Sequence, residues 1–108
     1  MKVSIVTVSF NSARTIEETI QSVLSQEGIE IEYIIVDGAS RDGTAEIIRR
    51  YEKKLAWWVS EPDRGQVDAL NKGFAHATGE VLGFLNADDV MLPGALKQAC
   101  ARFTKEPG

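Results

Sequence analysis

The sequence predicts an α/β fold of the Rossmann-like kind, in which helices flank a mostly parallel sheet. Two observations predict it. Short apolar, β-branched runs alternate four times with segments of helical periodicity along the 108 residues. Each connection is also long enough to place a helix between two parallel strands, with the right-handed crossover that such units adopt. We therefore expect a single sheet with helices on both faces.

The first half of the chain is expected to form two strands and two helices. Val3–Phe10 and Ile31–Val36 are rich in β-branched residues and predict buried strands. Between them, the letters TIEE match a capping box, in which Thr15 and Glu18 are expected to satisfy early helix amides. Gly28 is expected to end that helix. The apolar residues at helical spacing are Ile16, Ile20, Val23 and Leu24 in the first helix, and Ile47, Ile48 and Tyr51 in the second.

The second half repeats this order. Leu55–Ser60 and Val81–Leu85 predict the third and fourth strands. A helix is expected to begin near Gln66 and to be terminated by Gly79. Pro93 suits the first turn of a last helix. The residues expected to be buried are Val67, Leu70 and Phe74 in the third helix, and Leu96, Cys100 and Phe103 in the last.

Composition and charge narrow the classes of function. The chain is 44% hydrophobic and 26% charged, with a net charge of -4, which argues against a nucleic-acid partner bound through a general basic field. Cys100 is the only cysteine, so an internal disulfide is excluded. No apolar run approaches the roughly 20 residues that span a bilayer. The amino terminus predicts a strand rather than a signal peptide.

Several families with parallel sheets are excluded by their motifs. The letters FNSART follow the first strand, where a dinucleotide-binding domain would carry G-x-G-x-x-G. Neither a P-loop nor the G-x-S-x-G of α/β-hydrolases occurs. The adjacent carboxylates Asp88 and Asp89 follow the last predicted strand rather than the first. This order argues against a receiver-type phosphoacceptor. His76 has no neighbouring cysteine or second histidine, and we assign it no role.

Polar residues follow each predicted strand. They are Asn11, Asp37, the loop 61–65 and the segment 86–89. In open α/β sheets, ligands bind at the carboxyl ends of the strands. If the predicted fold is correct, these four clusters meet at one edge of the sheet and form a ligand site.

The letters VSIVTVSFN, IIVDGASRDGT and EPDRGQVDALNKGFAHATGEVLGFLNADD together resemble the amino-terminal half of a family-2 glycosyltransferase with the GT-A fold. The resemblance extends from about Lys2 to Phe103. It implies transfer of a sugar from a nucleotide-diphosphate donor to an acceptor, with inversion and with Mg²⁺ or Mn²⁺. It also implies that residues 1–108 are the nucleotide-sugar-binding part of a longer chain.

The resemblance assigns a nucleobase site to the end of the first strand. The segment that contains Val8, Phe10 and Asn11 would cradle the base, with the Phe10 ring packed near it. Asp37 would accept a hydrogen bond from the base. A carboxylate in that role favours uracil over cytosine, because only uracil offers an imide proton, so a UDP-sugar is the favoured donor. The alternatives are a core position for Phe10 and a turn role for Asp37.

The resemblance assigns the ribose, diphosphate and metal to the last two clusters. Arg64, Gly65 and Asn71 would lie near the ribose and diphosphate, and Asp88 near the ribose or its side of the metal. Asp89 would coordinate the metal, with Asp88 beside it. Asn86 stands where the longer acidic motif carries aspartate. The alternatives are a solvated loop position for Arg64 and a helix N-terminal charge pair for the two aspartates.

A general base for inverting transfer is expected outside this chain. Glu61 and Asp63 lie in the right neighbourhood, but nothing in the family pattern gives them that role. A glycan or lipid-linked acceptor and a cytoplasmic location at the inner face of the membrane follow from the resemblance. A truncated sheet would leave an open edge that invites self-association into a homo-oligomer. The rival classes are a non-catalytic nucleotide-binding or assembly module, a nucleotidyltransferase and a purely structural domain.

Overall fold

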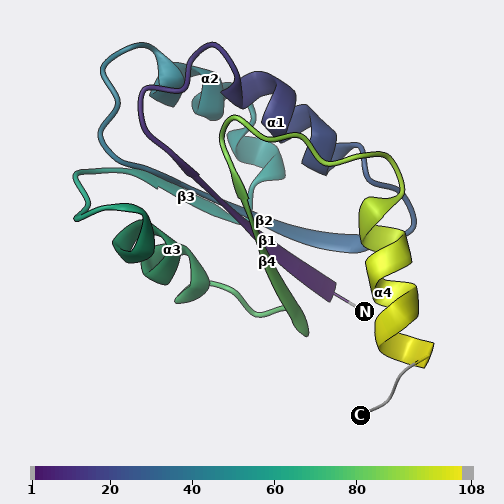
Figure 1. Cartoon of the computed structure of the whole chain (residues 1–108). Coiled ribbons are helices and arrows are strands. Elements are labelled where there is room, and N and C mark those ends of the chain that lie inside the picture. Colours follow the sequence, from purple (N-terminus) through teal and green to yellow (C-terminus); the bar gives the residue numbers. More distant parts are fainter. Residues whose placement is uncertain (1, 106–108) are drawn as a thin grey trace.

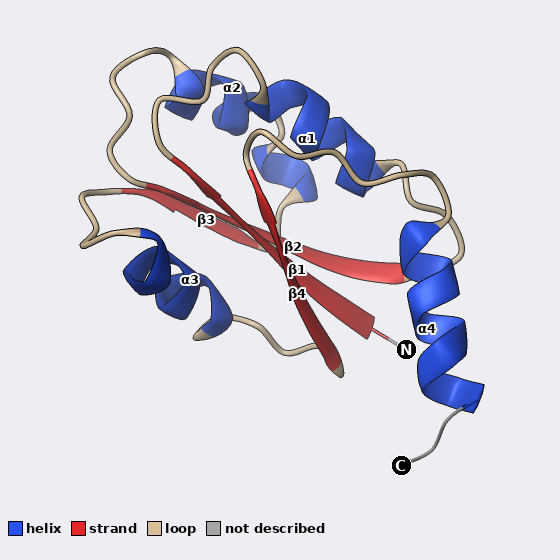
Figure 2. Ribbon diagram, in the orientation of Figure 1, coloured by secondary structure: helices blue, strands red, loops and turns tan. Residues whose placement is uncertain are grey.

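A computed structural model describes residues 2–105 of the chain. The strands and helices alternate as predicted (Figures 1 and 2). The elements, in chain order, are β1 (Lys2–Ser9), α1 (Ile16–Leu24), β2 (Glu30–Asp37), α2 (Thr44–Arg50), a short 3₁₀ helix (Glu52–Lys54), β3 (Trp57–Ser60), α3 (Gln66–Phe74), β4 (Val81–Asn86) and α4 (Ala95–Lys105).

The four strands form one parallel sheet in the order β3-β2-β1-β4. The fold class predicted from the sequence is therefore confirmed. The register aligns the carboxyl ends of the strands. Ser9 of β1 pairs with Asp37 of β2, and Asp37 pairs with Ser60 of β3. On the other side of β1, Val8 pairs with Asn86 of β4. These pairings place the polar residues that end the four strands side by side.

Alternation along the strands divides the core between the two faces of the sheet. On one face, Ile5 and Ile35 pack with buried residues of α1, α2 and α4. On the other face, Val6, Ile34 and Val36 pack with α3. Figure 2 shows α1 and α2 on one side of the sheet and α3 on the opposite side.

Small residues let α3 lie close to the sheet. Ala69 and Gly73 are its buried positions, and a Cβ atom on Gly73 would lie only 2.4 Å from Cγ1 of Val6. Val67 was expected to be buried but is 73% exposed. The physical reason is that the face carrying Ala69 and Gly73 turns Val67 toward solvent, so the apolar type of Val67 misled the prediction. After α3, the exposed His76 ring stacks on the half-buried Trp57 ring of β3, with centroids 3.6 Å apart.

The capping box predicted for the first helix and the end predicted for the third helix are both wrong. Thr15 lies at the N-cap of α1 without capping it, because its hydroxyl donates to the carbonyl of Ala87 at 2.8 Å. The capping box is thus replaced by a contact to the loop after β4. Helix α3 ends at Phe74, well before Gly79. Gly79 instead allows a close approach to β1, since a Cβ atom there would lie 2.8 Å from the Ser4 nitrogen.

The predicted end of the first helix and start of the last helix differ from the structure, whereas two of the predicted buried residues in the last helix are confirmed. Helix α1 ends at Leu24, before Gly28, and α4 begins at Ala95, after Pro93. Leu96 and Cys100 are buried as expected, whereas the side chain of Phe103 lies outside the described residues. None of the helices within residues 2–105 is both long and apolar enough to cross a bilayer.

Strand β4 exposes apolar side chains on the face that α3 covers elsewhere. Leu82 is 54% exposed and Phe84 is 55% exposed. Within the described residues β4 is also an edge strand of the sheet. Self-association through this region stays a prediction.

Candidate functional site

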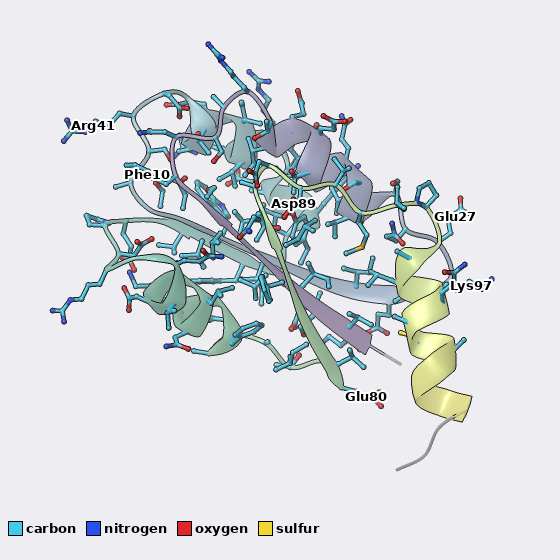
Figure 3. All side chains as sticks on the ribbon, viewed as in Figure 1. Phe10, Glu27, Arg41, Glu80, Asp89 and Lys97 are labelled. Atoms are coloured by element: carbon cyan, nitrogen blue, oxygen red, sulfur yellow. The ribbon has the colours of Figure 1, made fainter. Side chains whose placement is uncertain are left out.

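A cavity of about 850 Å³ lies at the carboxyl end of the sheet. Its walls come from the end of β1, the loops after β1, β2 and β3, the first turns of α3 and the turn after β4. Figure 3 shows Phe10 and Asp89 near this end of the sheet, and Glu80 at the opposite end of β4. The cavity therefore occupies the place where ligands bind in open α/β sheets.

The structure brings five of the predicted site residues together. Val8, Phe10, Asn11, Gly65 and Asp88 all line the cavity. Phe10 is 66% exposed, so its ring is not part of the core. An exposed aromatic ring at the rim of a cavity offers a flat apolar surface for a planar ligand. The other predicted residues, which do not contribute to the lining described, are Asp37, Arg64, Asn71 and Asp89.

Asp37 is fully buried and joins the ends of three strands. Its Oδ1 accepts hydrogen bonds from the hydroxyls of Ser9 at 2.7 Å and Ser40 at 2.6 Å. Its Oδ2 accepts from the Ser40 amide at 2.9 Å and the Ser60 hydroxyl at 2.8 Å. Ser9 and Ser60 flank Asp37 in the sheet register, which explains why both hydroxyls reach it. Both oxygens of this carboxylate are thus engaged within the protein.

The loops after β1 and β2 are linked by side-chain hydrogen bonds. The backbone N–H of Asn11 donates to the Ser40 hydroxyl at 2.7 Å. The side-chain Oδ1 of Asn11 accepts from the backbone N–H of Arg41 at 3.0 Å. Asn11 has a φ of 48°, a left-handed conformation that asparagine tolerates better than most residues. Asn11 therefore shapes the cavity wall in addition to lining it.

Asp42 fixes the next part of the same wall. Its Oδ2 accepts from the Ala13 amide at 3.1 Å, and its Oδ1 accepts from the amide of Thr44, also at 3.1 Å. The hydrogen bond from the Thr44 hydroxyl lowers the pKa of Asp42, against a smaller opposing effect of burial. Asp42 is therefore an anionic group held on the wall of the cavity.

The acidic pair follows β4 in a tight turn. Asp88 and Asp89 are both exposed. The Asp89 amide donates to the carbonyl of Asn86 at 3.0 Å, and the carbonyl of Asp89 accepts from the Thr19 hydroxyl of α1 at 2.5 Å. The main chain of the pair is thus anchored while its carboxylates stay accessible. Within residues 2–105, no group of three or more His, Cys, Asp or Glu side chains is placed to hold a metal.

Helix α3 begins at the cavity with an unusual backbone. Gly65 precedes it with a φ of 112°, and a Cβ atom built on Gly65 would meet no other atom within 4 Å. Glycine is preferred at position 65 because of this left-handed φ, and not because a side chain would lack space there. Oδ1 of Asp63 accepts from the Gly65 amide at 3.0 Å, and Asp68 accepts from the Arg64 amide at 2.9 Å. Two carboxylates therefore hold the backbone of this loop.

Several residues that line the cavity received no role from the sequence interpretation, among them Arg14, Asp63 and Gln66. Arg14 lines the cavity from the loop after β1, and Asp63 lines it from the loop after β3. Gln66 donates to Oδ1 of Asn86 at 2.8 Å, which links the start of α3 to the end of β4. The sequence feature that could have identified these residues is their position a few residues after a predicted strand. Lys72, in contrast, is paired with Glu61 at 3.3 Å.

Comparison with known proteins decides the family. The family model described as glycosyl transferase family 2 matches residues 4–108. The chain belongs to glycosyl transferase family 2. The resemblance inferred from the motifs is thereby confirmed, and the domain is an enzyme domain of the glycosyltransferase class.

Related sequences of this family 2 domain carry glycosyltransferase names. An uncharacterised glycosyltransferase of Mycobacterium tuberculosis is 42% identical over 88 residues, which cover 81% of this chain and 34% of that protein. A poly-beta-1,6-N-acetyl-D-glucosamine synthase of Staphylococcus epidermidis is 36% identical over 107 residues, covering 97% of this chain and 26% of the synthase. The chain thus spans about a third or less of the length of these curated relatives.

Solved structures of glycosyltransferases match the fold. TarS of S. aureus, in a complex with UDP-GlcNAc, matches with a TM-score of 0.86 at 29% identity, over 97% of this chain and 32% of that one. The mannosyltransferase PcManGT of Pyrobaculum calidifontis, in a complex with GDP-Man and Mn²⁺, matches with a TM-score of 0.84 at 30% identity, over the same shares. The GT-A fold predicted from the sequence is confirmed.

Proposed function

We propose that the cavity binds a nucleoside-diphosphate sugar, from which the whole enzyme transfers the sugar to an acceptor. The observation that carries this proposal is the convergence of Phe10, Asn11, Gly65 and Asp88 on one cavity at the carboxyl end of the sheet. The complexes of TarS with UDP-GlcNAc and of PcManGT with GDP-Man support the same class of donor.

Mg²⁺ or Mn²⁺ is the proposed cofactor, held by Asp89 and Asp88. A hard divalent cation takes oxygen ligands, and Mg²⁺ in phosphate sites needs only one or two carboxylates beside phosphate oxygens and water. Two adjacent exposed carboxylates on an anchored turn fit that requirement. The bound metal would neutralise negative charge on the diphosphate leaving group. PcManGT in its complex with Mn²⁺ supports this choice.

Most of the other predicted donor contacts are kept in this proposal, and Asn71 is left out of it. Val8 and Phe10 would pack against the base, and Gly65 would lie near the ribose. Arg64 is exposed and would reach the diphosphate from the loop after β3. Asn71 stays a prediction, since α3 turns Ala69 rather than Asn71 into the cavity.

For Asp37 the structure supports a different role from the predicted contact with the base. Its two oxygens already accept four hydrogen bonds from serines. A nucleobase would have to displace one of these bonds to reach it. We assign Asp37 to holding the strand ends together beneath the cavity.

The reaction as a whole is proposed from the family. The acceptor is a glycan or a lipid-linked glycan, the transfer proceeds with inversion, and the general base lies outside these 108 residues. The relatives named for poly-N-acetylglucosamine synthesis and for succinoglycan biosynthesis in Rhizobium meliloti support a role in envelope polysaccharide assembly. A cytoplasmic location at the inner face of the membrane, which the family resemblance implies, is proposed with this role.

Calorimetric titration of UDP, GDP and CDP into the chain tests the donor site. We expect one or more diphosphates to bind with Mn²⁺ and to bind at least tenfold more weakly after EDTA is added. Asp89→Ala is expected to produce a similar loss with Mn²⁺ present. Glu80→Ala is the matched control, because Glu80 is an exposed acid at the opposite end of β4 (Figure 3).

Three results would contradict the proposal. Failure of every nucleotide to bind a chain whose circular dichroism shows the native fold would remove the donor site. Binding that is equal with Mn²⁺ and with EDTA would remove the metal. Binding that depends on Mn²⁺ with no transfer by a longer chain would favour the non-catalytic nucleotide-binding module.

A further inference from the structure

Asp63 lies at the end of the cavity where Phe10 and Gly38 meet. A Cβ atom built on Gly38 would lie 2.8 Å from Oδ2 of Asp63 and 3.5 Å from Cδ1 of Phe10. Carboxylate and ring therefore lie next to each other above Gly38. All three residues line the cavity. A side chain at position 38 would displace the Asp63 carboxylate, so glycine there makes room for it.

One oxygen of Asp63 is anchored and the other is available. Oδ1 accepts from the Gly65 amide at 3.0 Å, which fixes the orientation of the carboxylate. Oδ2 has no hydrogen-bond donor among residues 2–105. Asp37, the carboxylate that the sequence pattern favoured, is buried and engaged with serines. Asp63 is thus the acid that can accept a hydrogen bond from a ligand beside Phe10.

We propose that Asp63 accepts the ring N–H of the donor's nucleobase, and so selects uracil or guanine over cytosine and adenine. This inference rests on the proposed function of the cavity as a nucleotide-sugar site. A carboxylate is only an acceptor. Uracil and guanine present a ring N–H beside their carbonyl groups, whereas cytosine and adenine present a lone pair at the corresponding ring nitrogen. Cytosine or adenine would therefore place two acceptors against each other.

The expected discrimination follows from the strength of a charge-assisted hydrogen bond. Such a bond contributes more than a neutral one, and its loss in a partly buried site corresponds to a weakening on the order of ten- to a hundredfold. Phe10 would add stacking, which every base can supply, so stacking alone does not discriminate. Selection among bases is thereby assigned to the one oxygen of Asp63 that no described protein group uses.

The test compares UDP, GDP, CDP and the diphosphate of 3-methyluridine by calorimetry with Mn²⁺. The wild-type chain is expected to bind UDP or GDP at least tenfold more tightly than CDP. If UDP is the tighter ligand, methylation of its ring nitrogen is expected to weaken it by a similar factor. This last comparison needs no variant, so misfolding cannot explain its result.

Asp63→Asn is the informative substitution. Its amide oxygen can still accept from Gly65, while its NH₂ group replaces Oδ2 and becomes a donor. We expect the ratio of UDP or GDP affinity to CDP affinity to fall below about threefold, in part because the new donor suits the cytosine ring nitrogen. Glu61→Gln makes the same change of charge in the same loop and is expected to keep the wild-type ratio.

The outcomes separate this inference from the proposed function. If the wild-type chain binds no nucleotide, both fail together. If it binds nucleotides and Asp63→Asn keeps the wild-type ranking with a native circular dichroism spectrum, only the role of Asp63 is overturned. Equal binding of UDP and its 3-methyl form would overturn that role as well.

Discussion

At the scale of single residues, Asp37 shows how similar sequence signals can carry different roles. An aspartate at the end of a strand is typical both of ligand sites and of structural turns. The sequence could place Asp37 at the strand end, but it could not reveal the three serine hydroxyls around it, because Ser9, Ser40 and Ser60 come from three separate segments. Only the parallel register brings them together.

Asp37→Ala tests the structural role directly. It would leave the hydroxyls of the buried Ser9, the half-buried Ser40 and the exposed Ser60, and the Ser40 amide, without their acceptor. We therefore expect the free energy of unfolding to fall by about 3 kcal/mol. Urea denaturation measures this loss, and Glu80→Ala is expected to change the free energy of unfolding by less than about 0.5 kcal/mol. Unchanged stability together with a tenfold loss of UDP affinity would instead restore the base contact predicted from the sequence.

At the scale of secondary-structure elements, the seating of α3 depends on Gly73. Alanine usually stabilises a helix by about 1 kcal/mol relative to glycine. Here the new Cβ would lie 2.4 Å from Cγ1 of Val6, so overpacking opposes that gain. We expect Gly73→Ala to lower the free energy of unfolding by about 1–2 kcal/mol.

A double-mutant cycle separates the contact from the helix propensity of Gly73→Ala. Val6→Ala removes the methyl groups that the new Cβ would meet, and the pair is expected to be coupled by about 1 kcal/mol or more. Thermal or urea denaturation of the two single variants and the double variant gives the coupling. Additive effects, or a stabilised Gly73→Ala, would show that α3 is not seated against β1 in this way.

The elements also mark the limits of prediction from this sequence. The alternation of strands and helices and the buried Leu96 followed from periodicity and were correct. The inward face of α3 did not follow, because the apolar type of Val67 concealed the role of two small residues. The Thr15 cap failed for a similar reason, since its hydroxyl has a long-range partner at Ala87 that no local pattern encodes.

The same limit applies to the candidate site. Phe10, Asn11 and Asp88 were expected near a ligand site because they lie at or just after the ends of predicted strands, and all three line the cavity. Arg14 and Gln66 were missed, because they reach the cavity from a loop and from a helix start whose positions depend on tertiary packing.

At the scale of the whole molecule, the end of the sheet opposite the cavity is held by Glu32. Its carboxylate accepts from the Ser4 hydroxyl at 2.7 Å and from the amide and hydroxyl of Thr78 at 2.7 and 2.8 Å, and it pairs with Lys2 at 3.2 Å. Burial alone would raise the pKa of Glu32. The hydrogen bonds outweigh burial and lower that pKa from 4.5 to about 2.

This lowered pKa predicts a stability that depends on pH. Because the carboxylate is favoured in the folded state, its contribution is complete above the unfolded pKa of 4.5 and is lost as the pH falls toward about 2. We expect Glu32→Gln to lower the free energy of unfolding by about 1–2 kcal/mol at pH 7, allowing for partial solvent screening. The difference from wild type should shrink steadily between about pH 5 and pH 2 on this basis.

Urea denaturation across that pH range measures the effect of Glu32→Gln. Glu80→Gln serves as the control, because it removes an exposed carboxylate near the same end of the molecule. Stability curves of wild type and Glu32→Gln that run parallel throughout the acid range would refute the role of Glu32.

The cluster around Asp37 has a consequence for how a ligand binds. Three strand ends are already locked together beneath Phe10 by hydrogen bonds within the protein, so this part of the cavity is preorganised and binding there loses little conformational entropy. Asp88, Asp89 and Val90, on the other side, are exposed after a single anchored turn. The ordering cost on ligand binding should therefore fall mainly on the exposed side chains of the acidic turn, because its main chain is already anchored to α1.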